Sequence, residues 1–181
     1  MGAYNYIQNT LEKEYKTADD VYKNKVRTWL KEPSINRVDR PSNLPRARRL
    51  GYKAKKGYVV VRVKIGKGRR ARPKPMGGRK PKSNYRFVPP GQSHQRIAEQ
   101  RVARIYRNME VMNSYWVGED GNHKFFEVIL GDPEMKTVEP GLVKGRGRAF
   151  RGLTSVGKKG RHGKKKTLNK KLQKQIREHR R

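Results

Sequence analysis

Basic side chains interspersed with glycine, proline and tyrosine are the residues of this sequence best suited to chemistry. Arginine guanidinium groups pair with phosphate oxygens two at a time, lysine supplies a point charge, and a tyrosine ring stacks on a base or sugar. The run RARRLGYKAKK supplies seven candidates: Arg46, Arg48, Arg49, Tyr52, Lys53, Lys55 and Lys56. The pattern predicts recognition of nucleic-acid phosphates, and the competing interpretation is a solvated, disordered charge run.

Two further stretches have a similar composition. The run GKGRRARPKPMGGRKPK adds six candidates: Arg69, Arg70, Arg72, Lys74, Arg79 and Lys80. The chain after residue 140 adds Arg151, Lys158 and Arg161, together with a short basic helix expected from Asn169 to Arg181. Its lysine block between Lys158 and Lys171 fits a nuclear-localisation signal or a loose tail equally well.

Catalysis and metal binding find little support. A hydrolase could use four polar residues: Ser114, Glu119, Asp120 and His123. Three of them fall in or beside a predicted hairpin turn, where acidic residues are expected for turn formation, and no second histidine is close in sequence. The chain contains no cysteine. We therefore predict no catalytic residue, no metal site, no cofactor, no small-molecule substrate and no enzyme.

The net charge of the chain limits the kinds of molecule that it can bind. With 47 Lys and Arg against 15 Asp and Glu, the formal charge of +32 requires a polyanion to relieve self-repulsion. An anionic membrane is the competitor, but no apolar run is long enough to span one and no signal-peptide layout is present. By segment the net charges are +1 for residues 1–32, +21 for 33–107, −5 for 108–140 and +15 for 141–181. The segments with low or negative net charge, 1–32 and 108–140, thus suit packing against protein. The strongly basic segments, 33–107 and 141–181, suit packing against phosphate.

The elements that must position these residues follow from periodicity. Apolar residues at helical spacing predict helices within residues 4–11 and 17–30, with a capping box from Thr17 to Asp20 and Trp29 in the core. Residues 33–57 hold three prolines and are expected to be extended. YVVVRVKI at 58–65 predicts a strand, whose Val59, Val61, Val63 and Ile65 share one face while the other face ends in cations.

A second group of elements completes the predicted body. Ser93 is a plausible N-cap for a helix reaching about Met109, with an apolar stripe that includes Val102 and Ile105. Asp120-Gly121 predicts a hairpin between strands at 111–117 and 124–130. The expected fold is α+β: a small, mostly antiparallel sheet of three or four strands packed with helices. Residues 1–140 form one body with basic extensions at about 33–57 and 66–92, and residues 141–181 form a basic C-terminal extension.

Three sequence motifs carry a family resemblance. RARRLGYKAKKGYVVVRVKIGKGRRARPKP, NSYWVGEDGNHKFFEVILGDP and RGLTSVGKKGRHGKKK closely resemble the L-fifteen-e family of large-subunit ribosomal proteins. The resemblance extends over most of the chain and is weakest at residues 9–32, 77–95 and 134–150. It implies a structural, cytoplasmic protein of the ribosome that binds ribosomal RNA through the matched basic positions and contacts neighbouring large-subunit proteins. The tail length favours an archaeal over a eukaryotic source.

Two other functions remain as alternatives. A chromosomal DNA-packaging protein would share the charge, but the basic residues lie in Gly/Pro-rich segments suited to irregular RNA rather than on a DNA-reading helix. Competition between ribosomal RNA and duplex DNA separates these two. An RNA-cleaving enzyme is the third hypothesis, and it would depend on Glu119 and His123 as an acid–base pair.

Overall fold

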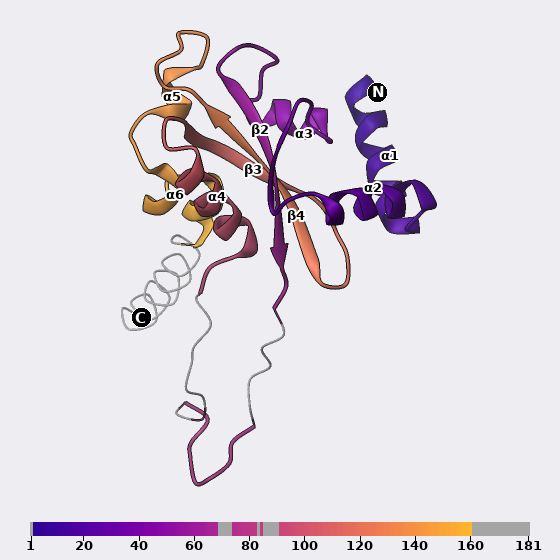
Figure 1. Cartoon of the computed structure of the whole chain (residues 1–181), viewed down its shortest axis with the longest axis vertical. Helices are drawn as coiled ribbons and strands as arrows, with labels where there is room; N and C mark the ends of the chain where they lie inside the picture. Colours follow the sequence, from indigo (N-terminus) through magenta and orange to yellow (C-terminus); the bar gives the residue numbers. More distant parts are fainter. Residues whose placement is uncertain (1, 69–73, 83, 85–90, 161–181) are drawn as a thin grey trace, which may run out of the picture.

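The chain folds around a four-stranded antiparallel sheet with helices on both faces (Figure 1). This computed structural model describes residues 2–68, 74–82, 84 and 91–160. In sheet order the strands are β1 (Ile35–Val38), β2 (Tyr58–Gly66), β4 (His123–Gly131) and β3 (Glu110–Glu119). The helices are α1 (Ala3–Thr17), α2 (Asp20–Lys31), α3 (Leu44–Arg49), α4 (His94–Ile105), α5 (Pro140–Val143) and α6 (Arg148–Arg151). The predicted α+β class is confirmed.

The β3–β4 hairpin forms where Asp120-Gly121 predicts it. The Asp120 carboxylate accepts hydrogen bonds from the backbone N–H groups of Asn122 and His123, which closes the turn in the way that aspartate commonly does. Glu119 and Lys124 face each other at the first ladder position. The hairpin thereby fixes the register of β3 against the central strand β4.

The first face of the sheet is aliphatic and is covered by α4 and α6 (Figure 1). Val61, Val63 and Ile65 of β2 pack there, as their alternation predicts. Ser93 caps α4 by accepting from the Arg96 N–H at 3.3 Å, again as predicted. The helix ends four residues earlier than expected, and Ile105 is 61% exposed instead of buried in the stripe.

The second face carries α2, α3 and a buried aromatic cluster. Trp29 is 8% exposed and packs on Phe125 with ring centroids 5.4 Å apart, so its predicted core role is confirmed. The predicted capping box is wrong. Thr17 ends α1 and its hydroxyl donates to the Lys13 carbonyl, while Asp19 occupies the N-cap position of α2 without a side-chain cap.

Residues 33–57 are not simply extended, which corrects the expectation from their prolines. They contain β1, which pairs with β2, and α3, whose Asn43 cap accepts from the Arg46 N–H at 2.9 Å. Pro45 lies in the first turn of α3, where a missing N–H costs nothing because that group has no partner within the helix. The segment is therefore part of the folded body.

The body also continues beyond residue 140. Val143 and Ala149 are buried in the two main core clusters, and Thr154 is buried beside α4. Residues 155–160 form a further helical stretch. The helix expected from Asn169 to Arg181 lies outside the described residues.

Candidate nucleic-acid interface

Three predicted arginines lie on α3 and are exposed, but two of them also bind α1. Arg48 contacts the Tyr4 hydroxyl and lies 5.5 Å from the centre of its ring, and Arg49 donates to the Gln8 side chain at 3.3 Å. These contacts join α3 to the N-terminal half of α1. The side chain of Arg46 makes no such contact and lines two hollows on either side of α3.

The loop between α3 and β2 presents the next group. Tyr52 is half-buried, with its ring 6.3 Å from that of Tyr58 in an edge-on arrangement, so it packs on the body instead of standing free for a base. Lys53, Lys55 and Lys56 are exposed. None of these three lysines forms an ion pair with an acidic side chain in the described structure.

The remaining predicted residues are spread over two other parts of the chain. Lys74, Arg79 and Lys80 are exposed in the described part of the 66–92 segment. Arg151 ends α6, and Lys158 lies in the 155–160 helical stretch; both are exposed. Four predicted positions lie outside the described residues: Arg69, Arg70, Arg72 and Arg161.

One buried carboxylate, Glu127, attaches the segment that carries α3. It is fully buried on β4, and Arg62 of β2 and Tyr115 of β3 stand directly opposite it in the sheet. It accepts from the Ser42 backbone N–H at 3.0 Å and the Ser42 hydroxyl at 2.6 Å, from the Tyr115 hydroxyl, and from Arg62 at 3.4 Å. Burial, and then the charge of Glu127, raise the pKa of the Tyr115 hydroxyl.

Arg62 extends this network to α2. It donates to both carboxylate oxygens of Glu32 at 3.1 Å, and its guanidinium lies 4.7 Å from the centre of the Trp29 ring. Lys64 on the same face donates to the carbonyls of Leu30 and Glu32. These two cations are occupied inside the protein, which distinguishes them from the exposed lysines.

Two other buried carboxylates attach the C-terminal part of the body. Glu110 accepts from the backbone N–H groups of Gly147 and Arg148 at the start of α6. Glu99 of α4 accepts from the Ser114 hydroxyl at 2.5 Å and the Thr154 hydroxyl at 2.7 Å. Burial raises the pKa of Glu99, although both hydrogen bonds oppose the shift. The sequence reasoning found none of these anchors.

The structure brings predicted Arg46 together with two cations that sequence reasoning had not chosen. Arg96 in the first turn of α4 and Lys159 in the 155–160 stretch line the same hollow as Arg46, which has a volume of about 540 Å³. Trp116 of β3 lies at its edge. Arg96 follows three residues after the Ser93 cap, and this spacing was the available signal for its place at the helix start.

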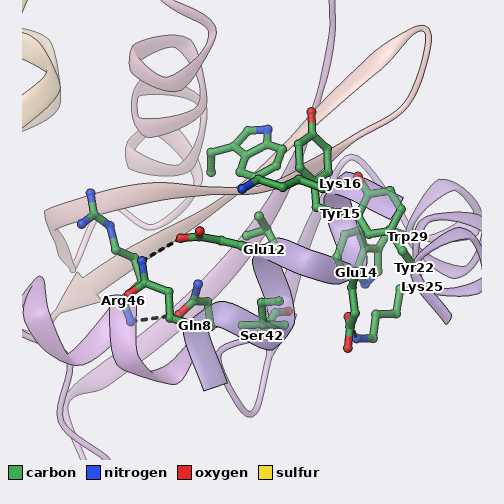
Figure 2. Close-up of a pocket in the computed structure, with 14 residues that line it drawn as sticks. Gln8, Glu12, Glu14, Tyr15, Lys16, Tyr22, Lys25, Trp29, Ser42 and Arg46 are labelled. Atoms are coloured by element: carbon green, nitrogen blue, oxygen red, sulfur yellow. Dashed lines mark hydrogen bonds and ion pairs between the residues drawn. The ribbon is translucent and has the colours of Figure 1, made fainter. Parts of the chain in front are cut away.

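On the other side of Arg46 lies an apolar cleft of about 490 Å³ between α1, α2 and the sheet. Figure 2 shows Tyr15, Tyr22 and Trp29 at one end of this cleft and Arg46 at the other. Lys25 pairs with Glu14 at 2.6 Å along its rim. Trp116 borders this cleft too, and Tyr15 meets its ring edge-on with centroids 4.7 Å apart.

The residues considered for catalysis do not form a site. Ser114 of β3 donates to buried Glu99 of α4. Asp120 lies in the turn instead, and its carboxylate is 3.4 Å from His123 Nδ1. Although partial burial opposes it, hydrogen bonds from Lys67 and Lys124 hold the pKa of Glu119 below its ordinary value. Among the described residues, no three metal-ligating side chains come together and no helix has the length and apolarity to cross a membrane.

The fold and surface thus define a class: a strongly basic binding protein built on a small α+β body. The family model described as Ribosomal L15 matches residues 2–181. The chain is 45% identical over 166 residues to the large ribosomal subunit protein eL15 of Nanoarchaeum equitans, covering 88% of this chain and 87% of that protein. It is 44% identical over 173 residues to the protein of the same name from Methanocella arvoryzae, covering 91% and 88%.

The chain therefore belongs to the ribosomal L15 family. Membership confirms the resemblance drawn from the basic and hairpin motifs. It also gives the chain a structural, non-enzymatic role in the large ribosomal subunit, in agreement with the prediction of no enzyme.

Proposed function

We propose that this chain binds and stabilises large-subunit ribosomal RNA by neutralising its backbone phosphates. One observation carries the proposal: exposed cations such as Lys53, Lys55 and Lys56 have no acidic partner in the described structure, while the buried carboxylates hold basic segments onto the body. Cations that lack a partner within the protein are available to displace counterions from RNA.

The predicted contacts divide between two parts of the chain. The folded body contributes the α3 arginines, the lysines of the following loop, Arg151 and Lys158. Residues 66–92 and the chain after residue 160 serve as basic extensions that bind between RNA helices. Neighbouring proteins of the large subunit are further partners, and the chain acts in the cytoplasm within the ribosome. Such phosphate contacts select RNA by its shape more than by its sequence.

Salt dependence tests this mechanism. If about 10 phosphates are neutralised on single-stranded-like RNA, the slope of log affinity against log salt is near −7. The measurement is a filter-binding titration of the full chain on a large-subunit ribosomal RNA fragment, with duplex DNA as competitor. A slope near zero, or equal competition by DNA, would contradict the proposal.

A charge variant sharpens the same test. Changing Lys53, Lys55 and Lys56 together to glutamine removes three exposed ammonium groups without touching a buried contact. The slope should become less steep by about 2, because each phosphate on single-stranded RNA contributes about 0.7. The matched control is Lys25→Gln, because Lys25 is already paired with Glu14 and its loss should leave the slope unchanged.

A further inference from the structure

The hollow beside α3 is a concave part of the basic surface, and distant parts of the chain build it. Arg46 comes from α3, Arg96 from α4, and Lys159 from the 155–160 stretch. Its volume of about 540 Å³ lies within the range of roughly 300–1,000 Å³ typical of small-ligand sites. Three segments well separated in sequence therefore supply cations to one cavity.

Among the residues that the structure describes, no acidic side chain lines this hollow. The carboxylate of Glu99 accepts from Ser114, which lines the hollow, and from Thr154, but it is itself fully buried. Cations grouped around a concavity with protein walls focus a positive potential into it. The hollow thus suits an anion, and the walls give that anion a defined position.

The floor of the hollow is held by a continuous set of hydrogen bonds. Gln95 donates to the Ser114 carbonyl and hydroxyl at 2.8 and 2.9 Å, and Ser114 and Thr154 both donate to Glu99. Thr154 in turn accepts from the Gly157 N–H at 3.2 Å, at the start of the stretch that carries Lys159. These bonds fix α4 and the 155–160 stretch, which carry Arg96 and Lys159, relative to β3. The segment leading into α3, which carries Arg46, is held separately by the Ser42 hydrogen bonds to Glu127.

An aromatic surface lies beside the cations. Trp116 is 37% exposed, whereas the chain's other tryptophan, Trp29, is buried. Tyr15 supports the Trp116 ring from the neighbouring cleft with an interplanar angle of 80°. An accessible indole next to several cations is the combination that single-stranded nucleic-acid sites use, with the base on the ring and the phosphate on the charges.

We infer that this hollow binds one unpaired nucleotide of RNA, with its phosphate between Arg46, Arg96 and Lys159 and its base against Trp116. The inference rests on the proposed function and adds a specific subsite to it. A base paired and stacked within a helix does not expose its face to a side chain, so the hollow selects single-stranded or extruded nucleotides. The exposed lysines, by contrast, contact backbone phosphates of either kind.

Fluorescence of Trp116 tests this inference directly. In the full chain carrying Trp29→Phe, Trp116 is the sole indole, and stacking on a base should quench it. The probe is single-stranded tetra-adenylate, with inorganic phosphate and an RNA duplex as comparison ligands. Tetra-adenylate should quench saturably, and the other two ligands should not. If Trp29→Phe fails to fold, the same titration uses the unchanged chain, in which buried Trp29 gives a constant background.

Two matched triple variants locate the effect. Arg46→Gln, Arg96→Gln and Lys159→Gln together should weaken tetra-adenylate binding at least tenfold, whereas glutamines at Lys53, Lys55 and Lys56 remove the same charge elsewhere and should weaken it less than threefold. Independently, Trp116→Leu should weaken binding of a labelled tetra-adenylate about tenfold, as loss of one stacked base does. Circular dichroism checks that each variant keeps its fold.

The outcomes separate this inference from the proposed function. Equal weakening by the two triple variants, or quenching by inorganic phosphate as strong as by tetra-adenylate, would overturn the nucleotide site. A steep salt slope on ribosomal RNA in that same case would leave the proposed function intact. Absence of salt-dependent binding to ribosomal RNA would instead contradict the proposed function itself.

Discussion

Two basic segments are joined to the same sheet by buried carboxylates, but the chemistry of the two junctions differs. Residues 39–57 are attached through Glu127, which accepts from Ser42 and faces the guanidinium of Arg62. Residues 144–160 are attached through Glu110 and through Glu99, whose carboxylate lies between two neutral hydroxyls. One junction contains an ion pair, and the Glu99 junction is a set of hydrogen bonds.

In a chain with a net charge of +32, buried carboxylates can therefore hold basic segments onto the folded body in two chemically different ways. A buried carboxylate that faces only donors must keep its charge, since a neutral amide would place N–H groups against N–H and guanidinium groups. A carboxylate between two hydroxyls can be replaced by a neutral amide at lower cost, because each hydroxyl can rotate to donate or to accept a hydrogen bond. The two junctions should therefore respond differently to the same glutamate-to-glutamine change.

The largest effect is expected for Glu127→Gln. The amide would face Arg62, the Ser42 N–H and the Tyr115 hydroxyl, and breaking a buried ion pair costs about 3–5 kcal/mol. The remaining pair between Arg62 and Glu32 places the expected loss of unfolding free energy near the lower end. Urea denaturation measures it, with exposed Glu12→Gln as the control. A loss below about 1 kcal/mol would show that the charge is not needed.

The next effect concerns backbone contact in the C-terminal segment. A Cβ atom on Gly157 would lie 2.5 Å from the Gly152 Cα, so Gly157→Ala must push residues 155–160 away from the body. We expect a loss of about 1–3 kcal/mol, as for other overpacked contacts. Hydrogen exchange should show faster exchange in this segment.

Gly160→Ala is the matched control for the previous change. Apart from its own helix backbone and its chain neighbours, its Cβ would have no atom of the described residues within 4 Å. It should leave both stability and exchange unchanged. Equal effects of the two alanines would mean that the close approach of Gly157 to Gly152 does not fix the segment.

A smaller effect is expected for Glu99→Gln. The amide oxygen can accept from one hydroxyl while its N–H donates to the other, so Ser114 and Thr154 both keep a partner. We expect a loss of about 1 kcal/mol in urea denaturation, typical of one exchanged hydrogen bond. A loss equal to that of Glu127→Gln would erase the distinction between the two junctions.

Local patterns predicted the regular elements well. Alternating valines in β2, Asp120-Gly121 in the turn and Ser93 before α4 each determine structure within a few residues. They therefore identified β2, the hairpin and the start of α4. The prolines of residues 33–57 led to the wrong prediction of an extended segment, because Pro45 lies in the first turn of α3 instead of preventing a helix.

The anchors and the hollow could not be predicted in the same way. Glu127 lies in the apolar run FFEVIL, and its burial depends on Ser42, 85 residues away in sequence. Arg46, Arg96 and Lys159 meet only because the sheet and the Glu99 network bring three segments together. Sequence patterns reveal charge and periodicity, whereas such partners are determined by tertiary packing.

The pH dependence of stability gives the smallest and most specific test of the Glu99 junction. Burial raises the pKa of Glu99, so between its ordinary value and the raised value the native state binds more protons than the unfolded state. Stability contributed by Glu99 is therefore present at low pH and is lost as pH rises through this window. The pKa values of Glu119 and Asp120 are lowered, so these two groups change the stability with pH in the opposite direction. Their contribution is the same in the unchanged chain and in the Glu99→Gln variant. The difference in unfolding free energy between the unchanged chain and Glu99→Gln should thus shrink as pH rises, and a difference that grew with pH would contradict the raised pKa of Glu99.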